Sequence, residues 1–154
     1  MAIARRYYES VALANALEAY LTTAGQNLGT VRRGFQSEES IAVPMVAVHF
    51  LPSGYIELQL GRSITTDKSF ERRVQVDLYL ETEQRADALC DVVADFFDEL
   101  YINVTDVNGD IIAHLYCPDS ETISMSTTPP IFKQAKILRW RGVVQATLQA
   151  DYLV

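Results

Sequence analysis

The sequence contains few of the residues that build disulfide frameworks and metal centres. It has two cysteines and two histidines among 154 residues, and neither histidine has Cys, Asp or Glu at the spacing of metal ligands. Cys90 and Cys117 are therefore predicted to be reduced, buried and apolar in character. His49 and His114 are predicted to be structural residues of strands, with a metal or catalytic role as the weaker alternative. No metal and no cofactor is expected.

The motifs of common enzyme classes are missing as well. No serine stands in a nucleophile elbow, and no glycine-rich phosphate loop precedes a helix. Asp106 and Asp110 flank Asn108 and Gly109 somewhat as in a calcium loop, but the other acidic positions are missing, so a tight type I′ hairpin turn is favoured. The protein is predicted not to be an enzyme, and no catalytic residue is proposed.

Long hydrophobic runs are also lacking. No segment approaches the roughly 18 apolar residues of a membrane span, and the start of the chain lacks the apolar segment of a signal peptide. With 49% hydrophobic residues, the chain is long enough for one domain, residues 1–154, with its own core. A soluble single-domain protein made in the cytoplasm is expected.

Negative charge exceeds positive charge, and the two signs are separated along the chain. The net charge of −7 argues against sequence-independent binding of nucleic acid. Residues 74–100 carry eight carboxylates against one arginine, whereas residues 1–34 and 62–73 each have a net charge of +2 and residues 131–154 of +3. Such separated patches indicate a protein that meets copies of itself head to tail.

The clearest structural pattern runs from Phe70 to Leu100. Strict alternation from Phe70 to Leu80 predicts a half-buried strand. Thr82 then stands at an N-cap position with Glu83 in the first turn. Apolar residues follow at spacings of three and four, which predicts a helix lying on a sheet: Ala86, Leu89, Cys90, Val93, Phe97 and Leu100.

The other segments complete an α+β fold. A first helix is predicted from Ser10 to Ala24, and a turn at residues 52–54 joins two strands. Strands are predicted at residues 28–35, 43–51, 55–62, 101–107 and 110–117, and in a closing segment from 131 that alternates cleanly from Trp140 to Tyr152. Residues 63–69 and 118–130 are predicted to be long polar connections. The expected architecture is a mostly antiparallel sheet with two main helices packed on one face.

Charged residues on these elements are candidates for a subunit interface. Four aspartates fall within a narrow arc of the second helix, where like charges four apart cost about 0.2–0.5 kcal/mol per pair. A solvated face is the simpler alternative. Arg72 points to the core side of its strand and needs a partner or a sheet edge. The candidate interface residues are Arg32, Arg33, Arg72, Arg73, Asp87, Asp91, Asp95 and Asp98.

Several features stand in a recognisable order over nearly the whole chain. An N-terminal helix leads to the apolar segment Val43-Pro44-Met45-Val46-Ala47-Val48, and the strand from Arg72 to Tyr79 leads at once into the helix that carries Ala86, Ala88 and Leu89. The step Trp140-Arg141-Gly142-Val143-Val144 enters a final strand that ends near Tyr152. This layout resembles that of the tail terminator (tail completion) proteins of long-tailed and contractile-tailed bacteriophages.

The resemblance implies a virion structural protein that forms a ring, commonly of six copies. The ring would terminate the tail tube and join it to the head connector, at the head-tail junction, after synthesis in the host cytoplasm. The implied partners are further copies of the chain, the tail tube protein, the head connector or neck protein, and the sheath of a contractile tail. DNA would pass through without specific binding. Candidate tube or connector contacts come from the two polar connections: Thr65, Thr66, Asp67, Lys68, Asp119 and Glu121.

Two alternatives remain open at this level. Neck and head-closure proteins of the same particles share short α/β layouts and differ in their partner. A small ligand-binding domain or enzyme belongs to a different class and requires a concave pocket with converging polar groups, for which the sequence shows no constellation.

Overall fold

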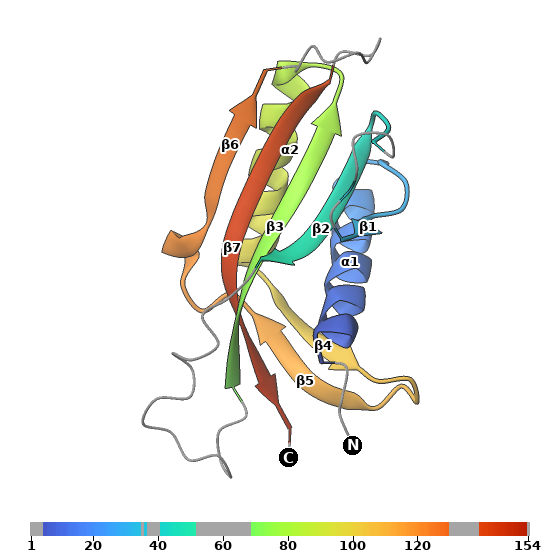
Figure 1. Ribbon diagram of the computed structural model, residues 1–154, viewed down its shortest axis with the longest axis vertical. Coiled ribbons are helices and arrows are strands. Elements are labelled where there is room, and N and C mark those ends of the chain that lie inside the picture. The colour runs from blue at the N-terminus through green and yellow to red at the C-terminus, as the bar shows by residue number, and fades with distance from the viewer. Residues whose placement is uncertain (1–4, 35, 37–40, 52–68, 130–138, 154) are drawn as a thin grey trace.

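The computed structural model describes residues 5–34, 36, 41–51, 69–129 and 139–153, and every structural statement below concerns these residues. The described residues form two helices, one short 3-10 helix (η3) and seven strands (Figure 1). In order, they are α1 (Arg5–Thr23), β1 (Arg32–Arg33), β2 (Met45–Leu51), β3 (Ser69–Leu80), α2 (Glu83–Asp98), β4 (Tyr101–Thr105), β5 (Ile111–Tyr116), η3 (Ser120–Thr122), β6 (Ser124–Thr128) and β7 (Trp140–Tyr152).

The seven described strands form one curled sheet, with β7 at its centre. The order is β1-β2-β3-β7-β5-β4, and β6 also pairs with β7. On one side β3 accompanies β7 from Trp140 to Asp151. On the other side β6 pairs with the first half of β7 and β5 with its end. Only β1 and β2 are parallel among the described pairs, so the fold is α+β with a mostly antiparallel sheet, as predicted.

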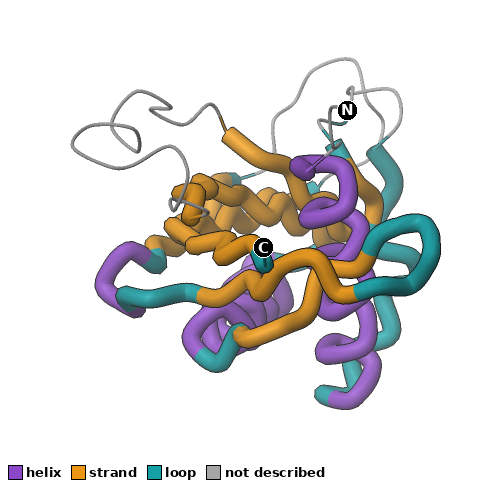
Figure 2. The backbone as a smooth tube through the Cα atoms, turned by 90° about the horizontal axis from the view of Figure 1, so that it is seen from below, coloured by secondary structure: helices purple, strands orange, loops and turns teal. Residues whose placement is uncertain are grey.

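Both helices cover the same face of the sheet. Figure 2, a view along the length of the molecule, shows them together on one side of the curl. Helix α2 packs on β7, β3 and β6, while α1 packs on β4, β1 and β2 and touches α2. Between the layers lies a continuous apolar core to which both helices and the inner faces of the strands contribute, including Leu13, Leu17, Leu78, Leu89, Phe97 and Leu148. Burial of this face is the main force that holds the layers together.

The passage from β3 to α2 forms as its residue pattern predicts. Thr82 caps α2, because its side-chain oxygen accepts a hydrogen bond of 3.2 Å from the backbone N–H of Arg85. The apolar stripe of α2 is buried and also includes Phe96. On β3 the inward residues are buried, but Asp77 and Tyr79 on the second face are buried too. The prediction of a half-buried strand is therefore wrong for the second half of β3.

Three other expectations are corrected. Helix α1 begins at Arg5 and not at Ser10, and its additional first turn brings Glu9 into the core. The predicted strand at residues 28–35 is reduced to the two residues of β1. The predicted long connection at 118–130 contains η3 and β6, because its serines and threonines pair with β7 without needing an apolar face.

The β4–β5 hairpin is confirmed, but its turn differs from the predicted tight turn. The backbone N–H of Gly109 donates to the carbonyl of Asp106 over 3.0 Å, which places Val107 and Asn108 at the centre of the turn. Gly109 follows with a φ of 83°, and the register shifts between Val104 and Thr105. The predicted segments at 52–54, 55–62, 63–68 and 131–138 lie outside the described residues.

Candidate interaction surfaces

Helix α2 presents an acidic face to solvent. Asp87, Asp91, Asp95 and Asp98 are all exposed, opposite the side of α2 that packs on the sheet. Asp87 accepts a hydrogen bond from the hydroxyl of Thr127 on β6, so this row begins beside the edge of the sheet. The structure brings the four predicted aspartates together as one surface, which we call the acidic face.

Two of the predicted arginines lie on the opposite flank of the helical layer. Arg32 and Arg33 form the exposed edge strand β1, which lies against α1. Arg33 donates from Nη1 to the Ser10 hydroxyl over 3.3 Å, and its guanidinium lies 5.0 Å from the ring centroid of Tyr7. Arg73 is exposed on the face of β3 that points away from the helices. These arginines are accessible to a partner.

Arg72 differs from the other predicted interface residues because it is buried, with 6% of its surface exposed. Its Nε donates to Glu9 Oε1 over 2.6 Å and its Nη2 to Glu9 Oε2 over 3.2 Å. The hydroxyl of Tyr152 also donates to the Glu9 carboxylate. The partner that the inward position of Arg72 requires is therefore Glu9 of the same chain. Because Arg72 is buried, it is not available to a second subunit.

The predicted tube or connector contacts are described only in part. Asp119 caps η3, since its carboxylate accepts a hydrogen bond of 2.9 Å from the backbone N–H of Glu121. Both residues are exposed beside the entrance to β6. The other candidates, Thr65, Thr66, Asp67 and Lys68, lie outside the described residues.

A polar network crosses the sheet on the face away from the helices. Asp77 Oδ1 accepts hydrogen bonds from Arg141 Nη2 over 2.8 Å and from Gln75 Nε2 over 2.9 Å. Gln145 Nε2 continues the network by donating to Gln75 Oε1 over 2.7 Å, and His49 Nδ1 lies 3.6 Å from Asp77 Oδ2. These contacts join β2, β3 and β7, so the network fixes strand register. His49 lies beside this network.

A second polar cluster gathers around Asp151 near the end of β7. Its carboxylate accepts hydrogen bonds from Ser69, from Gln149 and from the hydroxyl of Tyr116, at 2.6, 2.8 and 2.7 Å. Although burial acts in the opposite direction, these hydrogen bonds lower the pKa of the Asp151 carboxyl. The hydrogen bond to Asp151, together with burial, raises the pKa of Tyr116 to about 12. Asp151 is thereby held as a charged acceptor that joins β3, β5 and β7.

The raised pKa of Tyr116 predicts a loss of stability at alkaline pH. Because the folded pKa of about 12 lies above the ordinary value of 10.0, this contribution is complete below pH 10 and is lost as the pH rises toward 12. In a tyrosinate absorbance titration, Tyr116→Phe should remove a group that ionises late, near pH 12. A Tyr116→Phe variant that keeps all of the late absorbance of the wild type would contradict the assignment.

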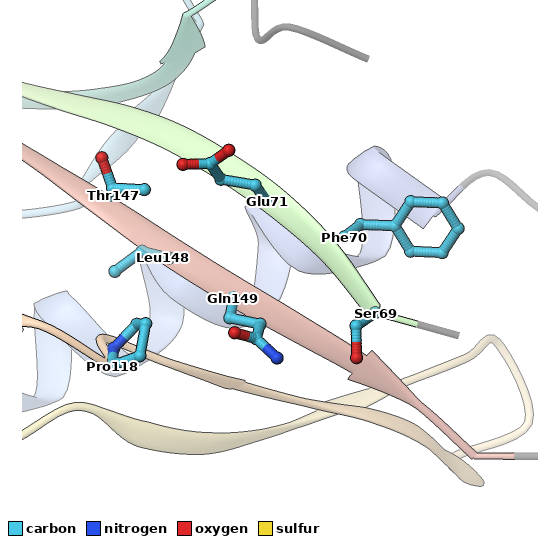
Figure 3. A pocket seen from close by; sticks show the side chains of 7 residues that line it. All are labelled: Ser69, Phe70, Glu71, Pro118, Thr147, Leu148 and Gln149. Carbon is cyan, nitrogen blue, oxygen red and sulfur yellow. The ribbon is translucent and has the colours of Figure 1, made fainter. Parts of the chain in front are cut away.

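A shallow hollow lies beside this cluster, between β3, β7 and Pro118. It measures about 150 Å³, about half the lower limit of typical small-molecule pockets. Figure 3 shows its cross-strand pair, Glu71 and Gln149, with their side chains pointing away from one another. The polar groups therefore do not converge on a common point, and the hollow does not have the geometry of a small-molecule site.

Within the described part of the chain, no group of three His, Cys, Asp or Glu side chains is arranged to hold a metal ion. None of the described helices is long and apolar enough to cross a membrane. Comparison of the sequence with known protein families and with curated proteins finds no match.

Sequence reasoning missed three residues that matter to these surfaces. Glu9 was not distinguished from a solvent-exposed glutamate, because nothing in its neighbourhood of the sequence indicates a partner 63 residues away. Tyr7 and Tyr101 are the exposed aromatic side chains among the large hydrophobic residues described, with 55% and 64% of their surface accessible. An aromatic residue at a helix start or strand start is the one signal that could have drawn attention to them.

Proposed function

We propose that the protein is a virion structural protein that assembles head to tail into a ring, of six copies as in the proteins it resembles. The ring terminates a phage tail tube and joins it to the head connector. The observation that carries the proposal is the separation of the acidic face of α2 from the arginines of β1 on one small domain. Two different complementary surfaces on one chain favour a repeating contact, which closes into a ring when the rotation permits.

The charge distribution also supports the proposed partners. Asp119 and Glu121 are exposed on η3, away from the flank formed by β1, and are available to the tube or the connector while both ring surfaces are occupied. The net charge of −7 disfavours tight non-specific binding of DNA, as suits a passage through which DNA must move.

The test is direct assembly. The purified protein is examined by native mass spectrometry and negative-stain electron microscopy, then added to growing tail tubes and separately to portal complexes. A ring that stops tube growth is the expected result. Capture by portal complexes alone would move the protein to the neck, and a monomer that ignores both would overturn the proposal.

Reversing charge on the acidic face should weaken the ring. Asp91→Lys with Asp95→Lys places positive charges where the next subunit presents arginines, and we expect the contact to weaken roughly tenfold, with less difference at high salt. Sedimentation velocity at several salt concentrations measures this change. Asp110→Lys with Glu121→Lys, both at exposed positions away from α2, changes the net charge by the same amount and is the control. An unchanged oligomer in the double variant would remove support for the acidic face as a contact.

A further inference from the structure

An apolar groove opens on the helical side of the fold. Helix α1, the end of α2 and the start of β4 enclose a space of about 300 Å³. Its walls are mainly apolar: Ala16, Ala19, Tyr20, Phe96, Leu100 and Tyr101. The rings of Tyr20 and Phe96 meet edge to face with centroids 5.4 Å apart. We call this space the tyrosine groove.

Tyr101 lies at the edge of the tyrosine groove. Its ring stacks on His114 and on Tyr116, with centroid distances of 5.4 and 5.7 Å. Asn103 holds His114 through a hydrogen-bond distance of 2.9 Å, and Asp151 holds Tyr116. Tyr101 is therefore exposed and well supported, and such a side chain loses little conformational entropy when a partner covers it.

The rim of the tyrosine groove is acidic. Glu99 lines the groove, and Asp95 is exposed on the neighbouring turn of α2. Burial raises the pKa of Tyr20, which lines the groove, and the negative charges of Glu99 and Asp95 raise it further. An apolar floor with a negative rim fits an apolar or aromatic side chain that has positive neighbours.

An aromatic side chain with positive neighbours lies where α1 meets β1. Tyr7 is exposed, with the guanidinium of Arg33 over its ring and the ring of Tyr8 against its edge at 5.5 Å. Arg6, which precedes Tyr7 in the chain, and Arg32, which precedes Arg33, are exposed as well. We call these residues the basic knob: Arg6, Tyr7, Arg32 and Arg33.

The basic knob of a chain does not reach its own tyrosine groove. Both include a tyrosine of α1, but Tyr7 and Tyr20 are 13 positions apart, or about 20 Å along the helix axis. The knob lies where α1 meets β1, as the hydrogen bond from Arg33 to Ser10 shows, while the groove lies between α1 and α2. The two surfaces are thus available at the same time to two different partners.

We propose that the basic knob of one copy binds in the tyrosine groove of the next copy, with Tyr7 against the apolar floor and its arginines against the acidic rim. The inference rests on the ring proposed above and names the contact that holds it. Tyrosine and arginine are the residues that most often dominate binding energy at interfaces. The contact joins unlike surfaces, so it repeats from copy to copy.

A chain-termination experiment tests this contact. The knob variant carries Tyr7→Ala and Arg33→Glu, and the groove variant carries Glu99→Arg and Ala19→Trp, the latter at an exposed position of the groove wall. Each variant alone should associate at least about 100-fold more weakly than the wild type. An equimolar mixture should form a heterodimer, in which the intact knob of the groove variant occupies the intact groove of the knob variant. Assembly should stop there, because the heterodimer has no other intact knob or groove. Native mass spectrometry measures both results.

The controls separate this inference from misfolding and from the proposed function. Formation of the heterodimer itself shows that both variants are folded. Arg73→Glu changes an exposed arginine on the other face of the sheet and should leave assembly unchanged. Variants that still form rings, a mixture that forms no heterodimer, or a wild type that is monomeric at millimolar concentration would each overturn the contact. A wild-type ring that fails to stop tube growth would overturn the function and leave the contact standing.

Discussion

Replacing Arg72 with methionine should lower the free energy of unfolding by about 3–5 kcal/mol, because the variant leaves the Glu9 carboxylate buried without its counter-ion. Glu9 has no exposed surface, and Arg72 supplies both of its charged hydrogen bonds. For a domain of this length the corresponding fall in Tm is about 10 °C. Thermal and urea unfolding, followed by circular dichroism, measure the loss.

A second substitution separates the lost charge pair from lost packing. Glu9→Gln with Arg72→Met removes both charges and keeps an acceptor for the hydroxyl of Tyr152, so the double variant should recover most of the loss. Arg73→Met, at the next position of β3 but exposed, should change stability by less than about 0.5 kcal/mol. If Arg72→Met and Arg73→Met cost the same, the buried pair does not support the fold as described.

Replacing Gly142 with alanine should destabilise the packing of α2 on β7. A Cβ at this position would lie 2.6 Å from Cys90 Sγ and 3.5 Å from both the carbonyl oxygen of Ala86 and the Cβ of Leu78. Relief requires the buried Cys90 side chain to shift or the helix and strand to separate. We expect a loss of about 1–3 kcal/mol in chemical denaturation, the usual cost of overpacking a core.

The Cys90 side chain provides the control for Gly142. Cys90→Ala removes the sulfur that the new Cβ would meet, so Gly142→Ala should cost clearly less in a Cys90→Ala background than in the wild type. Cys117→Ala, a half-buried cysteine away from this contact, should give no such compensation. Equal costs of Gly142→Ala with and without the sulfur would show that the close approach at Gly142 does not arise from Cys90.

The parts of the fold that could be predicted are those in which one side-chain pattern is strong over many residues. The alternation from Trp140 to Tyr152 and the stripe of α2 are both confirmed, because half of each element packs on the core and the other half does not. The cap at Thr82 is confirmed for a similar reason, since its partner lies three residues away. Such features can be predicted because the residues that form each pattern are close together in the sequence.

The missed features depend on contacts between distant segments. Strand β6 has no alternation, because all of its residues are exposed except the half-buried Thr127. The burial of Asp77 follows from its bonds to Arg141, 64 residues away, and could not be deduced from either segment alone. The tyrosine groove likewise needs α1, α2 and β4 to be placed before it exists. Of the candidate interface residues, the aspartates could be grouped from sequence because they share one helix.

The central position of β7 has a consequence for synthesis. All other described strands leave the ribosome before β7, yet three of them, β3, β5 and β6, pair with it. The sheet of a nascent chain therefore cannot be completed until Tyr152 has emerged from the ribosome. The pairing of β3 with β7 also joins segments that are far apart in the sequence.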